Sequence, residues 1–429
     1  MTLEEIYQIY LQHPVVCTDT RKLSTGCLFF ALKGENFNGN LFAEKALLAG
    51  AAYCIVDEAA HAKHENCILV NDVLKTLQDL AKHHRQQLKL PVIAIVGSNG
   101  KTTSKELISA VLQTKYTILS TPGNYNNHIG LPLTLLMLNK THQIAVIEMG
   151  ANHQLENAFL CEIACPSHGL VTNNGKDHLE GFGSMEGVII SNAELFDYLH
   201  QHQGIAFVNA NDAVLMQKSE SLENRILYGS AAVETVNNTN CQLHASSFQP
   251  TINFSLEATA INSPLSGDYN FDNILAAVSI GLHFGLNPIE IKQGIESYSP
   301  KNLRSQLIEK ENNKIFLDAY NANPSSMEVS IRNFVAMPGE NKILILGDMF
   351  ELGKYEAEEH QNLVEFCSNL GLEKVILVGS AFYKTHTTYQ KFEQTQEVAA
   401  YITANPFKNM FVFLKGSRGM KIESLIDCL

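Results

Sequence analysis

The sequence predicts an α/β protein of three domains: a small N-terminal α/β domain, a central doubly wound sheet and a C-terminal Rossmann-like α/β domain. Three observations lead to this prediction. The 429 residues exceed what one ordinary hydrophobic core holds. From about residue 91 onward, short apolar runs of strand type alternate with helical stretches. The stretch 91–116, PVIAIVGSNGKTTSKELISAVLQTKY, reads as a strand, a glycine loop and a helix in succession.

Composition and charge limit the class of protein. Hydrophobic residues make up 45% of the chain and charged residues 17%, which is typical of globular domains. The net charge of −13 argues against a broad basic face for nucleic acid. The nine cysteines are scattered without zinc-finger spacing, the N-terminus lacks a signal-peptide layout, and no apolar run reaches membrane-spanning length. We therefore expect a cytoplasmic protein with reduced thiols and without membrane insertion.

Residues 1–88 are expected to form the N-terminal domain. Helical patterns cover residues 3–12, 43–49 and 73–87, and strand patterns cover residues 27–32 and 52–56. Asp19, Thr20 and Arg21 lie beside a turn-rich loop, where they would be placed to grip a charged ligand. From spacing alone, a solvated contact between Asp19 and Arg21 is the better account.

The central domain is expected over residues 89–299, and its glycine loop predicts a phosphate site. Glycines let backbone N–H groups approach an anion, and the helix N-terminus adds further donors. Lys101 would reach the outer phosphates of a nucleoside triphosphate, and the Thr102 hydroxyl would ligate Mg²⁺. The motif G-x-x-G-K-T-T is shorter than the usual phosphate-loop pattern, so the flanking strand and helix carry the prediction. The predicted nucleotide site comprises Gly97, Ser98, Asn99, Gly100, Lys101, Thr102 and Thr103.

Polar groups follow several further strands of the central domain. Glu148 closes the strand run 144–149 beside the glycine loop, where Mg²⁺ needs a hard oxygen ligand. His178 follows the strand run 169–172; a second metal site and an ordinary loop position are both open, and the latter is favoured. Another strand is expected at 205–208, a β-hairpin region at 229–262 and a helix at 269–284. The loop 121–130 is either turn chemistry or a ligand-reading segment, through Thr121, Asn124, Asn126 and Asn127.

The C-terminal domain is expected over residues 300–429. Strand patterns occur at 315–317, 342–346, 374–378 and 410–414, and helices fit at 326–334 and 357–370. Asp318 follows the first strand and would bond ribose hydroxyls, whereas Asn323 is equally suited to cap the next helix. From spacing alone, two interpretations of these strand ends are equally good: a rim that binds a ligand, or ordinary charged residues exposed to solvent. The candidate substrate residues here are Tyr320, Asn321, Asn323, Lys415, Ser417 and Arg418.

Motifs along nearly the whole chain resemble those of the Mur ligases. They are GSNGKTT, TPGNYNNHIGLPLTLL, IEMGA, HLEGFGS, GDYNFDN, DAYNANPSSM, LGDMFELG and LKGSRGMKIE, in that order. The set is most similar to the branch that adds D-alanyl-D-alanine to UDP-N-acetylmuramoyl-tripeptide. The resemblance implies an ATP- and Mg²⁺-dependent ligase that works through an acyl phosphate in peptidoglycan precursor synthesis. It also implies a monomer whose N-terminal domain holds the uridine nucleotide and whose C-terminal domain holds the incoming dipeptide.

The resemblance implies a role for individual residues. Lys101 would hold the outer phosphates, Thr102 and Glu148 one Mg²⁺, and His178 a second. Asn270 and Asn273 would read adenine, while Arg304 and Asp318 would reach ATP from the C-terminal domain. The catalytic residues implied in this way are Lys101, His178 and Arg304.

One position departs from the pattern of the family. Mur ligases usually carry a carbamylated lysine in the helix after HLEGFGS, and Asn192 occupies that position here. A neutral amide does not supply the negative charge of a carbamate. We hypothesise that Asp177, where the family often has a small residue, partly replaces it. The alternatives are a ligase of folylpolyglutamate-synthase type and a catalytically weakened nucleotide-binding paralogue.

Overall fold

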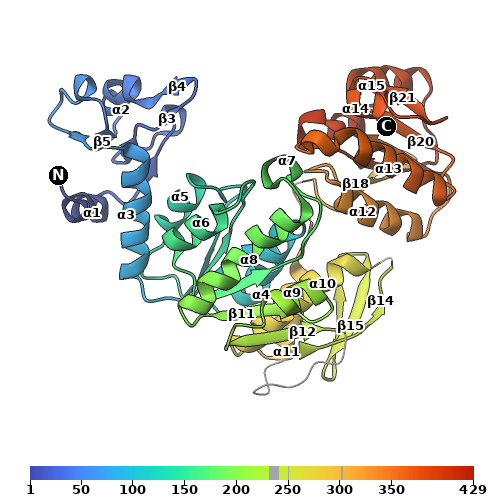
Figure 1. Cartoon of the computed structure of the whole chain (residues 1–429), viewed down its shortest axis with the longest axis horizontal. Helices are drawn as coiled ribbons and strands as arrows, with labels where there is room; N and C mark the ends of the chain where they lie inside the picture. Colours follow the sequence, from blue (N-terminus) through green and yellow to red (C-terminus); the bar gives the residue numbers. More distant parts are fainter. Residues whose placement is uncertain (231–240, 250, 301–302) are drawn as a thin grey trace.

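The protein consists of three α/β lobes that follow one another along the chain, which confirms the predicted fold class (Figure 1). The computed structural model describes residues 1–230, 241–249, 251–300 and 303–429. Residues 231–240 of the expected hairpin region therefore lie outside the described part. Within that part, no helix combines the length and apolar character needed to cross a bilayer.

The N-terminal lobe is a parallel four-stranded sheet in the order β1-β2-β5-β6, with a small hairpin, β3–β4, beside it. Its first and last helices contact the central lobe. The Tyr10 hydroxyl donates to the carbonyl of Leu136 at 2.6 Å, and the Arg85 guanidinium donates to the carbonyls of Ala164 and Cys165. The elements are α1 (Leu3–Gln12), β1 (Val16–Cys17), β2 (Leu28–Phe30), β3 (Lys33–Gly34), β4 (Phe37–Asn38), α2 (Ala43–Leu48), β5 (Tyr53–Val56), β6 (Cys67–Leu69) and α3 (Val73–Gln87).

The central lobe is built on a parallel seven-stranded sheet in the order β13-β12-β11-β10-β7-β9-β8. Its chain order reverses beside β7, and ligands of doubly wound sheets bind at the carboxyl ends of strands at such a point. The strands are β7 (Val92–Val96), β8 (Ile118–Ser120), β9 (Ile144–Glu148), β10 (His168–Val171), β11 (Ile205–Asn209), β12 (Arg225–Gly229) and β13 (Cys241–Gln242). A separate antiparallel sheet holds β14 (Ala245–Ser247), β15 (Ile252–Leu256) and β16 (Thr259–Ser263).

Helices cover both faces of the central sheet, and alternate residues of β7 face opposite layers. Val92, Ala94 and Val96 join the core formed with α3, α5, α6 and α8, whereas Ile93 and Ile95 join the core beneath α4 and α10. Burial on both faces explains why β7 reads as an uninterrupted apolar run. The helices are α4 (Lys101–Gln113), α5 (Gly130–Leu135), α6 (Glu156–Ala164), α7 (Leu179–Phe182), α8 (Met185–Gln201), α9 (Ala213–Lys218), α10 (Asp268–His283) and α11 (Pro288–Ser297).

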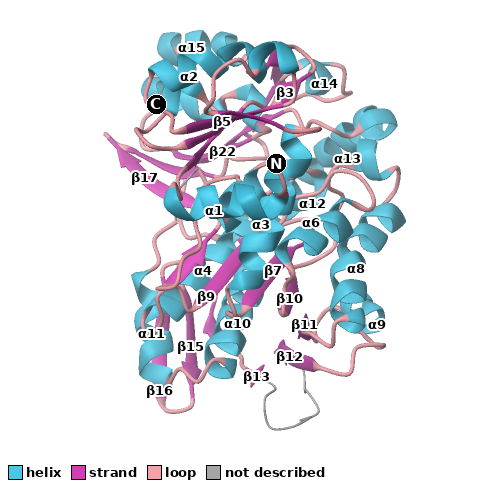
Figure 2. Cartoon of the chain, turned by 90° about the vertical axis from the view of Figure 1, so that its left-hand side faces the viewer, coloured by secondary structure: helices cyan, strands magenta, loops and turns pink. Residues whose placement is uncertain are grey.

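The C-terminal lobe is a six-stranded sheet in the order β17-β18-β22-β19-β20-β21, parallel except for β17 at one edge. Figure 2 shows this lobe and the N-terminal lobe on the same side of the central one. The strands are β17 (Gln306–Lys310), β18 (Asn313–Leu317), β19 (Lys342–Gly347), β20 (Val375–Val378), β21 (Gln390–Phe392) and β22 (Phe411–Lys415). The helices are α12 (Pro324–Ala336), α13 (Glu356–Asn369), α14 (Ser380–Tyr383) and α15 (Thr395–Ala404).

Two histidines meet where β10 begins and α10 ends, at the end of the sheet opposite the glycine loop. His168 Nε2 lies 3.1 Å from His283 Nε2, and the rings of Phe207 and Phe284 pack around them. Burial and the neighbouring His283 lower the pKa of His168 to about 4, and burial lowers the pKa of His283. The fold therefore holds His168 in its neutral form.

We expect this pair to make the central lobe acid-sensitive. Since the unfolded chain binds a proton near pH 6.5 and folded His168 binds it only near 4, stability is full above pH 6.5 and falls as the pH drops toward 4. The loss attributable to His168 is on the order of 3 kcal/mol. Calorimetric unfolding of His168→Gln between pH 7.5 and 5 should show a smaller pH slope than the wild type. His153→Gln, whose parent side chain is 65% exposed, should keep the wild-type slope; equal slopes in all three proteins would contradict the assignment.

Candidate active site

The glycine loop joins β7 to α4 and needs glycine at two positions. Gly97 and Gly100 have φ angles of +128° and +81°, a region that other residues rarely adopt. A Cβ at Gly97 would lie 2.2 Å from Thr172 Oγ1, and one at Gly100 would lie 2.6 Å from Asn273 Oδ1. The loop is thus pressed against both β10 and α10. This close packing leaves the N-terminus of α4 at the carboxyl edge of the sheet.

Lys101 is the first residue of α4, and its side chain turns back over the loop. Its ammonium donates to the carbonyls of Gly97 and Ser98. Helix N-termini offer unpaired N–H groups and a partial positive charge to an anion. The ammonium and the start of α4 therefore concentrate positive charge at one place, as a triphosphate requires.

A buried polar cluster lies beside the loop. The Thr102 hydroxyl donates to Glu148 Oε2 at 2.9 Å, and the Asn126 amide donates to Glu148 Oε1 at 2.9 Å. The ammonium of Lys105, only 5% exposed, lies 3.7 Å from Glu148 Oε2 and donates to the carbonyl of Thr121. The hydroxyl and the carboxylate are hard oxygen ligands next to a phosphate site, so this pair fits Mg²⁺. Lys105 was not among the sequence-derived candidates, because a lysine on a helix reads as a surface residue.

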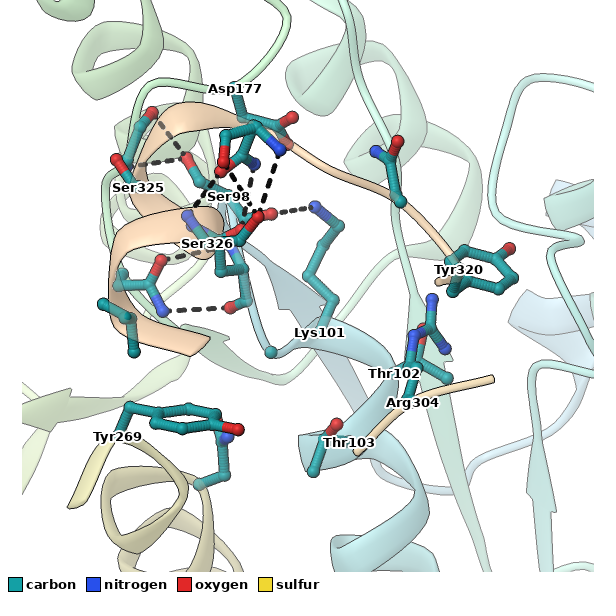
Figure 3. A pocket seen from close by; sticks show the side chains of 18 of the residues that line it. Ser98, Lys101, Thr102, Thr103, Asp177, Tyr269, Arg304, Tyr320, Ser325 and Ser326 are labelled. Carbon is teal, nitrogen blue, oxygen red and sulfur yellow. Dashed lines mark hydrogen bonds between the residues drawn. The ribbon is translucent and has the colours of Figure 1, made fainter. Parts of the chain in front are cut away.

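A cavity of about 630 Å³ opens between the central and C-terminal lobes. Figure 3 shows Lys101, Thr102 and Thr103 on its central wall, with Arg304 and Tyr320 at one end. Its lining therefore combines groups that lie more than 200 residues apart in sequence. The candidates that line it are Ser98, Asn99, Gly100, Lys101, Thr102, Thr103, Asn126, Asn127, Glu148, His178, Asn270, Asn273, Arg304, Asp318, Tyr320, Asn321, Asn323 and Lys415.

The two asparagines of α10 bond mainly to the protein itself. Asn273 Oδ1 accepts from the Ser104 hydroxyl at 2.9 Å, and Asn273 Nδ2 donates to Asn270 Oδ1 at 3.2 Å. Asn270 Nδ2 in turn donates to the carbonyl of Ser266. The chain of bonds fixes the start of α10 against α4 below the glycine loop. A part in reading adenine remains a prediction for both residues.

The C-terminal wall of the cavity holds two cationic side chains, Lys415 and Arg304, and a third, Arg418, lies just beyond it. Lys415 donates to Asp318 Oδ2 at 2.6 Å, and the Ser330 hydroxyl donates to the same oxygen at 2.9 Å. The guanidinium of Arg304 stacks over the Tyr320 ring, 3.7 Å from its centroid. Arg418 lies 5.4 Å from the same centroid. Asp318 is therefore neutralised by Lys415, while the two arginines leave the wall with a positive surplus.

Direct bonds tie the C-terminal lobe to the glycine loop. Asn323 caps α12 through its Oδ1 and donates from Nδ2 to Asn99 Oδ1 at 2.9 Å. The Ser325 hydroxyl accepts from the backbone N–H of Lys176. Lys176 Nζ also lies 2.6 Å from the nearly buried carboxylate of Glu359. Asn323 thus serves as a helix cap and as a contact between the two lobes.

His178 lies between two carboxylates at the same junction. Its Nδ1 pairs with Glu351 of the C-terminal lobe, and its Nε2 lies 3.7 Å from Asp177. Burial opposes the charged imidazole, but these carboxylates outweigh it and raise the pKa of His178. His178 is thus in contact with a carboxylate of each lobe, and a part in a second metal site remains a prediction. In the described part of the chain, no three His, Cys, Asp or Glu side chains gather in a metal-binding arrangement.

Asn192 is buried in α8, and its amide donates to Asn174 Oδ1 at 2.9 Å. Asn174 lies in the loop after β10, two residues before Lys176. Among the described residues, no hydrogen bond or ion pair joins the side chain of Asn192 directly to that of Asp177. Asn192 thus supports the loop that carries Asp177 and His178.

The other candidates lie outside the cavity. The Arg21 guanidinium lies 2.8 Å from Asp19, exposed on the N-terminal lobe, and its bonds lower the pKa of Asp19 to about 2. The Thr121 hydroxyl accepts from the backbone N–H of Glu148, and Ser417 bonds the backbone of Phe350. Thr121 and Ser417 are both buried. Asp348 is buried too, and its carboxylate accepts from the backbone at the start of α14. The expectation that the strand ends of the C-terminal lobe carry only solvated charges is therefore wrong for Asp348 and Ser417. Thr20, Gly97, Asn124 and Arg418 also lie outside the cavity lining.

Comparison with known proteins places this arrangement in a family. Family models match residues 14–90 (Mur ligase family, catalytic domain), 95–281 (Mur ligase middle domain) and 303–418 (Mur ligase, glutamate ligase domain). UDP-N-acetylmuramoyl-tripeptide–D-alanyl-D-alanine ligase of Bacillus subtilis is 34% identical, over 96% of this chain and 92% of the relative. The enzyme of that name from Escherichia coli is also 34% identical, over 96% and 93%.

Solved structures agree with the sequence matches. MurF from Acinetobacter baumannii superposes with a TM-score of 0.86 at 30% identity, covering 96% of this chain and 92% of that one. MurF ligase from Thermotoga maritima, solved in complex with ADP, gives 0.84 at 26% identity, covering 97% of both chains. A folylpolyglutamate synthase from Mycobacterium tuberculosis shares only the fold, with 12% identity and a TM-score of 0.61. With identity of this level over nearly its whole length, the chain belongs to the Mur ligase family.

Proposed function

We propose that the protein is an ATP-dependent ligase that joins D-alanyl-D-alanine to UDP-N-acetylmuramoyl-tripeptide in peptidoglycan precursor synthesis. The observation that carries the proposal is the shared cavity, in which a lysine-bearing glycine loop faces Arg304 and Lys415 of the C-terminal lobe. The chain matches 92% and 93% of the length of the two relatives that bear the name of this ligase and were compared above. We place the protein in the cytoplasm as a monomer; nine free cysteines suit a reducing compartment.

The proposed reaction has two steps. A carboxylate oxygen of the tripeptide attacks the γ-phosphorus of ATP, ADP leaves, and an acyl phosphate results. The amine of D-alanyl-D-alanine then attacks the acyl carbon, loses a proton, and inorganic phosphate leaves. Lys101 and Arg304 neutralise the transferring phosphoryl group from opposite lobes, and contacts such as Asn99 with Asn323 hold the lobes together. Closure of the lobes keeps water from the acyl phosphate.

Mg²⁺ would be held by Thr102 and Glu148, where it would neutralise phosphate charge. We assign the uridine nucleotide to residues 1–88, with Asp19, Thr20 and Arg21 exposed there. The central ATP-binding domain spans 89–299 and the dipeptide-binding domain 300–429. Asn321, Asn323, Lys415, Ser417 and Arg418 belong to the proposed substrate wall of the latter.

Phosphate release from purified protein tests the proposal. We expect ATP-dependent release only when both UDP-N-acetylmuramoyl-tripeptide and D-alanyl-D-alanine are present. Release with a folate acceptor and glutamate would instead support a ligase of folylpolyglutamate-synthase type. Binding of ATP without release under any of these conditions would identify a catalytically weakened paralogue, and would contradict the proposal.

The position of Asn192 gives a second test. Because an asparagine amide does not react with CO₂ to form a carbamate, phosphate release should be unchanged when bicarbonate is depleted. If Asp177 supplies the missing charge, Asp177→Ala should raise the Mg²⁺ concentration for half-maximal activity about tenfold, equivalent to ~1.4 kcal/mol. The Mg²⁺-dependent rise in melting temperature with ADP present should shrink in parallel. An unaltered Mg²⁺ dependence in Asp177→Ala would remove this role.

A further inference from the structure

Two arginines share one aromatic ring at the end of the cavity. The guanidinium carbons of Arg304 and Arg418 lie 3.7 and 5.4 Å from the centroid of the Tyr320 ring. Stacking on an aromatic face holds a guanidinium without consuming its N–H donors. Figure 3 shows the ring of Tyr320 beside the Arg304 side chain. Both forks therefore keep donors available for an anion.

The ring and Arg418 are held in place by buried bonds on neighbouring strands. Tyr320 follows β18 and Arg418 follows β22, and these strands pair in parallel. On one side Lys415 donates to Asp318 at 2.6 Å, and on the other the Ser417 hydroxyl donates to the carbonyl of Ala322. The two bonds tie the segment on both sides of Tyr320 to Lys415 and Ser417, which closely precede Arg418. The spacing between the ring and the guanidinium therefore depends on how β18 and β22 pair.

Charge balance shows what this arrangement lacks. Within the described part of the chain, neither Arg304 nor Arg418 has a carboxylate within 4.0 Å, although Arg21 has one at 2.8 Å. Asp318, which lines the same cavity as Arg304, is already paired with Lys415. Among the described residues, both guanidinium groups are therefore without a salt-bridge partner. Arg304 lines the cavity that holds Lys101, whereas Arg418 lies just beyond that lining and is exposed.

We propose that Tyr320 is a positioning residue that holds Arg418 to read the free carboxylate of the incoming dipeptide, while its contact with Arg304 links that site to the phosphate side of the cavity. This rests on the proposed ligase function. A guanidinium fork matches a carboxylate through two parallel N–H···O bonds. Tyr320 and Arg418 would thus make the enzyme selective for acceptors that end in a free carboxylate.

The test compares two acceptors, D-alanyl-D-alanine and its C-terminal amide, by ATP-dependent phosphate release. We expect wild type to prefer the free acid at least tenfold in kcat/KM, and Arg418→Met to abolish the preference. Tyr320→Leu should reduce the preference about tenfold, chiefly through the KM of the acid, whereas Tyr320→Phe should retain it. Adding Arg418→Met to Tyr320→Leu should lower the preference for the free acid only slightly further, because both substitutions remove the same contact. A merely structural defect would slow both acceptors equally.

Tyr383→Leu is the matched control. Tyr383 is 47% exposed and lies 5.5 Å from a lysine ammonium, Lys391, away from the cavity. It should behave as wild type with both acceptors. If wild type is active and Tyr320→Leu keeps its preference for the acid, the role of Tyr320 is wrong and the proposed function stands. If wild type releases no phosphate with either acceptor, both fail.

Discussion

Replacing Lys101 by methionine is expected to lower phosphate release about 10³-fold, the size of effect seen when one charged or donor group is removed from a developing oxyanion. Among the described residues, Lys101 Nζ bonds only carbonyls of its own loop, at Gly97 and Ser98. Methionine keeps the length of the side chain and removes the charge, so folding should be little affected. Steady-state phosphate release with both substrates and calorimetric ATP binding measure the two consequences. Affinity for ATP should fall together with the rate.

Lys115→Met serves as the control for Lys101→Met. Lys115 lies just beyond the other end of α4, is exposed and donates to the carbonyl of Gly285. It carries the same charge and is equally close to the helix, but it lies outside the cavity lining. Phosphate release by Lys115→Met should stay within about twofold of wild type. Release by Lys101→Met at a comparable level, with ATP affinity retained, would show that the glycine loop is not the phosphate site.

Thr102 and Glu148 illustrate why part of the site is predictable from sequence. Thr102 lies in the first turn of α4, which follows β7, and Glu148 is the last residue of β9. Because β7 and β9 pair in parallel, both residues lie at the same edge of the sheet. Apolar runs mark these strands because both faces are covered, and polar residues near their carboxyl ends then lie close together. The 2.9 Å contact between the two side chains follows from that topology. Asp318 and Lys415 meet at the ends of β18 and β22 for the same reason, although the sequence patterns alone did not pair them.

Other features leave no mark on the sequence. β21, Gln390–Phe392, reads QKF and has no apolar run, because it lies at the edge of its sheet. His178 and Glu351 each stand in a motif, HLEGFGS and LGDMFELG, but their pairing depends on how two lobes dock, which neither motif shows. Docking is set by many side chains at once, so spacing along the chain does not encode it. The packing of α3 against α5 and α6 is another contact between lobes that spacing along the chain does not predict.

Replacing Lys105 by methionine is expected to destabilise the central lobe by about 3–5 kcal/mol, because it leaves the carboxylate of Glu148 buried without a cation. Glu148 is 3% exposed, and Lys105 Nζ lies 3.7 Å from its Oε2. Lys105 also donates to the carbonyl of Thr121, so the variant loses a bond to the loop after β8 as well. For a lobe of this size the melting temperature should fall on the order of 10 °C, measured by calorimetry without nucleotide.

The double variant Lys105→Met/Glu148→Gln separates a buried charge from lost packing. Glutamine is nearly the shape of glutamate, and its amide oxygen still accepts from Thr102 or Asn126, so no charge remains unpaired. Stability should therefore recover by most of the loss, and the two substitutions should be strongly non-additive. Lys75→Met, which breaks an exposed pair with Asp79, should change stability by less than about 1 kcal/mol. A double variant no more stable than Lys105→Met would mean that the lysine acts through its contact with the Thr121 carbonyl and not through its charge on Glu148.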